Sequence, residues 1–130
     1  MLFFNFGAMK AGKSESLIRE YKRLKNEGEH VLVWNSKLDE RRKGYVSSRN
    51  EELDDIQSSL LKNTTNLFNR FFIEIARLSW TIHDSKRVGE PNTVLLVDEA
   101  QFLTAQQVDQ LSILAEYEDV TVKCYGLRTN

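Results

Sequence analysis

Two short stretches, far apart in the sequence, carry residue types suited to phosphate chemistry. The first reads GAMKAGKS and has the spacing G-x-x-x-x-G-K-S of a P-loop. Gly7 and Gly12 let phosphate oxygens approach backbone N–H groups, Lys13 brings a positive charge to the outer phosphates, and Ser14 offers a hydroxyl to Mg²⁺. A surface turn that matches by chance is the alternative. The candidate triphosphate-binding residues are Gly7, Ala8, Met9, Lys10, Ala11, Gly12, Lys13 and Ser14.

The second stretch is an acid pair, Asp98 and Glu99, directly after the apolar run TVLLV. An acid at the end of a buried strand is the usual second half of a nucleotide site. Asp98 is suited to hold Mg²⁺ together with Ser14, and Glu99 is then free to accept a proton. Two adjacent acids can also mark only the start of a helix.

A polar segment, residues 36–50, gathers five basic residues around Gly44 and is predicted to be a long loop. Arginines at the rim of a phosphate site neutralise charge on the transferring group, so Arg41 or Arg49 is a candidate catalytic residue. The alternative is that these arginines only solvate the loop.

The remaining pattern predicts elements that would bring these residues together. Strands are expected at residues 2–6, 30–34, 93–97 and 120–125, and the first of them is expected to be buried. Helices are expected at 13–26, with Gly28 as a stop signal, and over most of 51–84, with a cap near 63–65. The sequence TAQQ at 104–107 has capping-box spacing before a third helix. The order predicts one α/β domain over residues 1–130, with a P-loop NTPase-type, RecA-like parallel sheet flanked by helices.

Composition narrows the function classes. The chain has 130 residues, 41% hydrophobic and 28% charged, so it can bury a hydrophobic core without support from disulfides or a structural metal. A net charge of -1 gives no general basic field for nucleic acid or an anionic membrane.

The single cysteine, Cys124, and two distant histidines fit neither a disulfide nor a zinc site, and Cys124 is expected to be a small buried hydrophobe. No stretch has the length of a membrane span or the pattern of a signal peptide, so a cytoplasmic protein is expected.

The motifs together resemble one family. FFNFGAMKAGKS, VLVWNSKLDER, VLLVDEAQFL and the final KCYGLRTN follow the order and approximate spacing of type II thymidine kinases, the cellular and bacterial kind. The resemblance covers about residues 1–50 and 93–130, and VDEAQF after a strand is its most discriminating part.

The resemblance implies transfer of the γ-phosphate of ATP, with Mg²⁺, to the 5′-hydroxyl of deoxythymidine. Glu99 resembles the family's base, and Asp98 resembles the acid near the metal. Arg41, in the aspartate-x-arginine that Asp39 opens, resembles the arginine near the phosphates. A homo-oligomer is implied by the same analogy. The positions that match the family's nucleoside pocket are Met9, Phe102 and Leu127.

The family pattern continues into a lasso loop that holds the base and a zinc ribbon with four cysteines, and these 130 residues contain no zinc-ribbon domain. Three functions are therefore weighed. The first is a nucleoside kinase, and the second is a nucleotide-binding regulatory or assembly protein without acceptor binding. The third, a nucleic-acid-stimulated ATPase, depends only on the basic loop and conflicts with the net charge.

Overall fold

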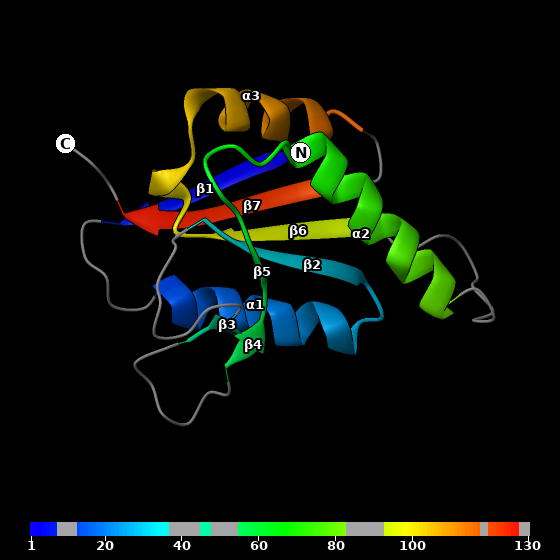
Figure 1. Ribbon diagram of the computed structural model, residues 1–130. Coiled ribbons are helices and arrows are strands. Elements are labelled where there is room, and N and C mark those ends of the chain that lie inside the picture. Colours follow the sequence, from blue (N-terminus) through cyan, green and yellow to red (C-terminus); the bar gives the residue numbers. More distant parts are fainter. Residues whose placement is uncertain (8–12, 37–44, 48–54, 83–92, 118–119, 128–130) are drawn as a thin grey trace.

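The protein is built on a five-stranded, all-parallel sheet with helices on both faces (Figure 1). The computed structural model describes residues 1–7, 13–36, 45–47, 55–82, 93–117 and 120–127. The strands lie in the order β1 (Leu2–Gly7), β7 (Val120–Leu127), β6 (Thr93–Asp98), β2 (His30–Asn35) and β5 (Ser59–Leu60). The helices are α1 (Lys13–Asn26), α2 (Leu67–Ile82) and α3 (Ala105–Leu114). The predicted α/β sheet is confirmed, and α1 has the predicted bounds.

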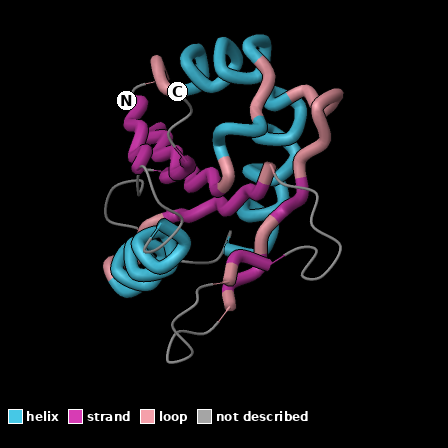
Figure 2. Tube along the Cα trace, turned by 90° about the vertical axis from the view of Figure 1, so that its left-hand side faces the viewer, coloured by secondary structure: helices cyan, strands magenta, loops and turns pink. Residues whose placement is uncertain are grey.

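The two faces of the sheet are covered by different helices, as the end-on view of Figure 2 shows. Alternate residues of each central strand point to opposite faces. Val94 and Leu96 of β6 pack toward α1, whereas Leu95 and Val97 pack toward α2 and α3. This double burial explains why the central strands read as continuous apolar runs in the sequence.

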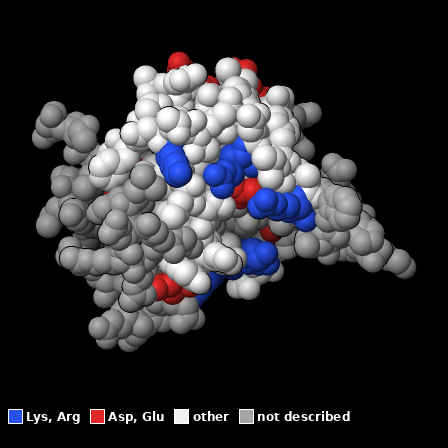
Figure 3. Space-filling model, viewed as in Figure 1, with Lys and Arg blue, Asp and Glu red and all other residues white. Residues whose placement is uncertain are grey.

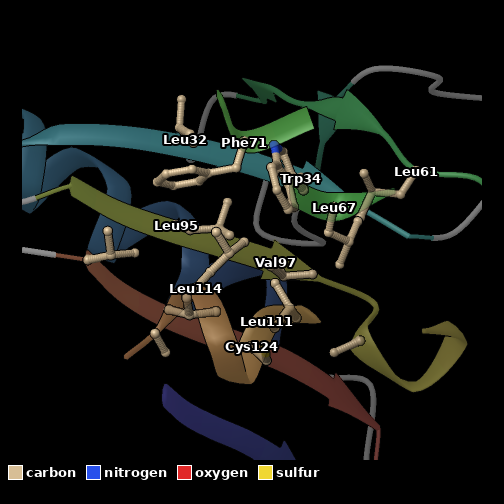
Figure 4. Close-up of a cluster of buried hydrophobic side chains, with 14 residues drawn as sticks. Leu32, Trp34, Leu61, Leu67, Phe71, Leu95, Val97, Leu111, Leu114 and Cys124 are labelled. Atoms are coloured by element: carbon tan, nitrogen blue, oxygen red, sulfur yellow. The ribbon is translucent and has the colours of Figure 1, made fainter. Parts of the chain in front are cut away.

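The larger core cluster lies between the sheet and the pair α2 and α3 (Figure 4). Trp34 is fully buried there, and its indole N–H donates to the Glu74 carboxylate of α2 at 3.1 Å. Cys124 is also fully buried, and burial raises the pKa of its thiol to about 12. The expectation that Cys124 is a packed hydrophobe is confirmed.

The helix predicted to begin near residue 51 is wrong for its first part. Ile56–Gln57 forms β4, which pairs antiparallel with β3 (Tyr45–Val46), a strand inside the predicted loop. Ser59–Leu60 forms β5 and extends the main sheet beside β2. Ile56 and Leu61 are buried, but through these strands and not through one helix face.

The cap predicted at 63–65 is also displaced. The side chain of Asn66, directly before α2, accepts from the backbone N–H of Asn69 at 3.1 Å. The capping box of α3 is confirmed, because the Thr104 hydroxyl and the Gln107 side chain each bond the other's backbone N–H at 3.1 Å.

The strand β1 forms as predicted, but its expected burial is wrong. Within the described residues β1 pairs only with β7 and is an edge of the sheet. Phe3, Phe4 and Phe6 are 46%, 44% and 43% exposed, and the rings of Phe4 and Phe6 stack with centroids 5.2 Å apart.

The charge on the visible surface and the length of the helices bear on what a binding surface or a membrane span would need. On the face seen in Figure 3, the basic side chains that are drawn stand singly or in small groups on a mostly uncharged surface. None of the helices in the described ranges is long and apolar enough to cross a membrane.

Candidate active site

The sequence motifs meet at the carboxyl edge of the sheet, on the left of Figure 1. β1 ends at Gly7, α1 begins at Lys13, and β6 ends at Asp98. In parallel sheets this edge is the usual place for ligands, because the strand ends and helix starts converge there. The arrangement places the start of α1 beside the end of β6.

One hydrogen bond joins the two motifs directly. The hydroxyl of Ser14, in the first turn of α1, donates to the Asp98 carboxylate at 3.2 Å, although the residues are 84 positions apart. Asp98 is only 4% exposed. A nearly buried carboxylate beside a hydroxyl forms a compact pair of oxygen donors at the start of the helix.

Glu99 has an unusual backbone. It lies in the left-handed region, with φ 56° and ψ 43°, between β6 and the short 3-10 helix η1 (Ala100–Phe102). The Glu99 carboxylate accepts a hydrogen bond from the Gln101 side-chain amide at 2.5 Å. The acid pair therefore sits on a sharp turn, and one of its carboxylates is held by a neighbour in η1.

The backbone of the acid pair is held from β2. Ser36 follows β2 and is 7% exposed. Its backbone N–H donates to the Asp98 carbonyl at 3.2 Å, and its hydroxyl lies 3.1 Å from the same carbonyl and also contacts the Glu99 carbonyl. Ser36 thus fixes the direction in which the chain leaves β6.

Comparison with known protein families shows which family the chain belongs to. The family model described as thymidine kinase matches residues 1–130, the whole sequence. The chain belongs to the thymidine kinase family. Relatives named thymidine kinase include those of Salmonella typhimurium, at 38% identity, and of Idiomarina loihiensis and Escherichia coli O157:H7, each at 34%. The matches cover 99% of this chain but only 57%, 60% and 57% of those relatives, respectively. The chain therefore spans less than two thirds of their length.

The remaining site residues expected from the thymidine kinase resemblance are only partly described. Residues 8–12, which include Met9, and Arg41 lie outside the described residues. Leu127 ends β7, but its side chain is not described. Phe102 ends η1 and is 47% exposed, so its ring is open to a ligand. The structure thus brings together Ser14, Asp98 and the backbone of Glu99.

Sequence reasoning missed three residues at this edge of the thymidine kinase fold, namely Ser36, Gln101 and Gly126. A Cβ on Gly126 would lie 2.6 Å from Gln101 Oε1, 2.9 Å from the Phe6 ring and 3.2 Å from the Ala100 backbone nitrogen. A larger residue at this position would therefore displace the end of the Gln101 side chain and the Phe6 ring. The segment GLRTN contained this glycine, but no local pattern indicated which side chains would cross it.

The side-chain oxygens of Ser14 and Asp98 are also suited to bind Mg²⁺. No group of three or more His, Cys, Asp or Glu side chains able to hold a metal occurs among the described residues. Mg²⁺ at a triphosphate needs fewer protein ligands, because phosphate oxygens and water complete its shell. The paired oxygens of Ser14 and Asp98 fit that requirement.

Proposed function

We propose that this member of the thymidine kinase family transfers the γ-phosphate of ATP to the 5′-hydroxyl of a deoxynucleoside, with thymidine as the expected acceptor. The hydrogen bond between Ser14 and Asp98 carries the proposal. It places the hydroxyl that follows the P-loop lysine against the acid that ends the buried strand. The names of the relatives supply the acceptor class.

The triphosphate would be held by residues 7–14 at the start of α1. Backbone N–H groups and the positive end of the helix dipole favour an anion there. Lys13, the first residue of α1, adds a full charge for the outer phosphates. Ser14 and Asp98 would hold Mg²⁺, which, when bound, supplies charge neutralisation on the phosphate oxygens.

Glu99 would act as the base for the acceptor hydroxyl. Because it directly follows Asp98 on the turn out of β6, a group that binds there lies near both acids. A base must be within hydrogen-bond reach of the proton that it takes. Arg41 would stabilise the charge that develops during transfer, and the proposed nucleoside contacts are Met9, Phe102 and Leu127.

The wider biological role is proposed from the family alone. The chain would act as one P-loop domain, associate into a homo-oligomer and work in the cytoplasm, supplying a phosphorylated nucleoside for DNA synthesis. These proposals depend on the kinase reaction and are secondary to it.

Two substitutions test the site. Lys13→Ala should weaken magnesium-dependent ATP binding roughly 10- to 100-fold, because a charged hydrogen-bond donor is lost. Glu99→Gln should leave that affinity unchanged and lower the rate of thymidine monophosphate formation roughly 10²- to 10⁴-fold, because the general base is lost. Affinity is measured by calorimetry with a non-hydrolysable ATP analogue, and product by chromatography.

Matched controls lie on the exposed surface. Lys25→Ala, at the last turn of α1, and Glu116→Gln should change neither quantity, because both side chains are exposed. ATP binding by the unmodified chain without transfer to any nucleoside would instead support the regulatory alternative. Absence of ATP binding would refute both.

A further inference from the structure

The backbone of Glu99 is strained. Within the described ranges it is the one non-glycine residue with a positive φ. A left-handed conformation is unfavourable for residues that carry a Cβ, and it persists only where surrounding contacts impose it. Residues in such conformations concentrate at functional sites.

Two sets of contacts impose this conformation. Ser36, from the end of β2, holds the carbonyls of Asp98 and Glu99. Gln101, from η1, donates its side-chain amide to Glu99 Oε2 at 2.5 Å. The first set fixes the backbone, and the second fixes the carboxylate.

Strand β7 leaves room for the Gln101 amide at Gly126. A carboxylate only accepts hydrogen bonds, so the amide nitrogen has to face Glu99 and the amide oxygen points away. That oxygen lies 2.6 Å from the position of a Cβ on Gly126. The missing side chain at Gly126 therefore makes the space that the Gln101 amide occupies.

We propose that Gln101 is a positioning residue that holds the Glu99 carboxylate in place for proton transfer. The inference rests on the proposed function, because it assigns Gln101 a role through the base of that reaction. Without the amide, the Glu99 side chain is free to rotate about its single bonds. Gln101 does not contact the reacting groups itself.

Gln101→Met and Gln101→Glu test this role. Methionine has a similar length but no donor, so kcat for thymidine phosphorylation should fall about tenfold, in line with loss of a charge-assisted hydrogen bond. KM for ATP should stay within twofold. Gln101→Glu also places a second negative charge beside Glu99, so kcat should fall further. Gln106→Met, on the exposed surface of α3, is the matched control and should be neutral.

A double-mutant cycle separates positioning from a merely structural role. In a Glu99→Gln background, adding Gln101→Met should not lower the residual rate further, because the group that Gln101 positions is already lost. An equal fractional loss in both backgrounds would overturn the inference. Urea unfolding of each variant checks that the fold is retained.

A measurement that needs no catalysis tests the contact between Gln101 and Glu99 independently of the kinase reaction. The side-chain amide resonances of Gln101, observed by ¹⁵N NMR, should shift when Glu99 is replaced by alanine and should not shift in Glu116→Ala. Unchanged resonances would refute the inference even if the kinase reaction is found. A shift in a chain that forms no product would support the contact while the proposed function fails.

Discussion

Gly126 lies where β7, η1 and the ring of Phe6 meet, and its lack of a side chain shapes the proposed site. Gly126→Ala should destabilise the protein by about 1–3 kcal/mol, because the added methyl overpacks a filled space. The same methyl should displace Gln101 and lower the rate of phosphoryl transfer. Urea unfolding and initial rates measure the two effects.

Gly28 provides a contrasting control. It follows α1 with φ 82°, and a Cβ there would meet no atom within 4 Å. Its requirement is conformational and not steric, so Gly28→Asn should be nearly neutral, because asparagine tolerates the left-handed region. An equal loss of stability at both positions would contradict the steric explanation for Gly126.

The sequence predicted the two motifs at the carboxyl edge, because parallel strands bring their ends to one edge whatever lies between them. Ser14 and Asp98 therefore meet as expected. The roles of Ser36 and Gln101 were not predictable, since each depends on a turn whose left-handed backbone no local pattern revealed.

Among the elements, α3 does more than cover the sheet. The side chain of Gln107 is 2% exposed and completes the capping box. It also donates to the carbonyls of Lys62 at 2.8 Å and Thr65 at 3.1 Å, in the segment that leads into α2. Gln110 accepts from the N–H of Leu67, the first residue of α2. Helix α3 thus fixes where α2 begins.

Substitutions in the capping box should therefore have unequal effects. Thr104→Ala should cost about 1 kcal/mol, as for loss of a cap. Gln107→Ala should cost more, about 2 kcal/mol or above, because it also leaves two carbonyls without their partner. Gln106→Ala, which is exposed, should have little effect. Urea midpoints give the order, and equal costs for Thr104 and Gln107 would contradict the link to α2.

The segment at residues 53–61, which was predicted to be helical, shows why part of the fold could not be predicted. Leu53, Ile56, Leu60 and Leu61 have helical spacing, yet the described part forms two-residue strands. Such short strands are decided by distant partners, β3 and β2, and not by local periodicity. Longer runs with one consistent period, such as 93–97 and 13–26, were predicted correctly.

An ion pair between elements gives the fold a dependence on pH. Lys123 of β7 and Glu20 of α1 lie 3.2 Å apart. Burial alone would raise the pKa of Glu20, but hydrogen bonds and charges from Lys123 and Arg23 outweigh it, so the pKa is lowered. The unfolded state then binds the proton more tightly. The stabilisation is present above roughly pH 4.3 and is lost as pH falls through the folded-state pKa.

Lys123→Met should reduce this loss of folding stability at acid pH. The variant should be less stable than the unmodified chain at pH 7, and the difference should narrow as the pH falls below about 4. Urea unfolding at several pH values measures it. Lys25→Met, on the exposed surface, should not change the pH dependence, and a constant difference for Lys123→Met would argue against the ion pair as the cause.

At the scale of the whole molecule, β1 is an apolar strand that, among the described residues, pairs on one side only. An apolar edge strand with open backbone groups favours association with other chains. We expect this 130-residue chain to self-associate as its concentration rises. Phe4→Lys should suppress association, whereas Ile113→Lys, at similar exposure on α3, should not. Sedimentation velocity measures this, and a monodisperse monomer at high concentration would disprove it.

The pairing of β1 with β7 joins the first and last described strands and places β7 between β1 and β6. A nascent polypeptide cannot complete this sheet while β7 is still inside the ribosome. The phosphate loop and the acid pair are translated earlier, but they stay without the strand that sets them side by side. Assembly of this edge of the sheet therefore waits until β7 is available, and the early strands need protection from misassociation until then.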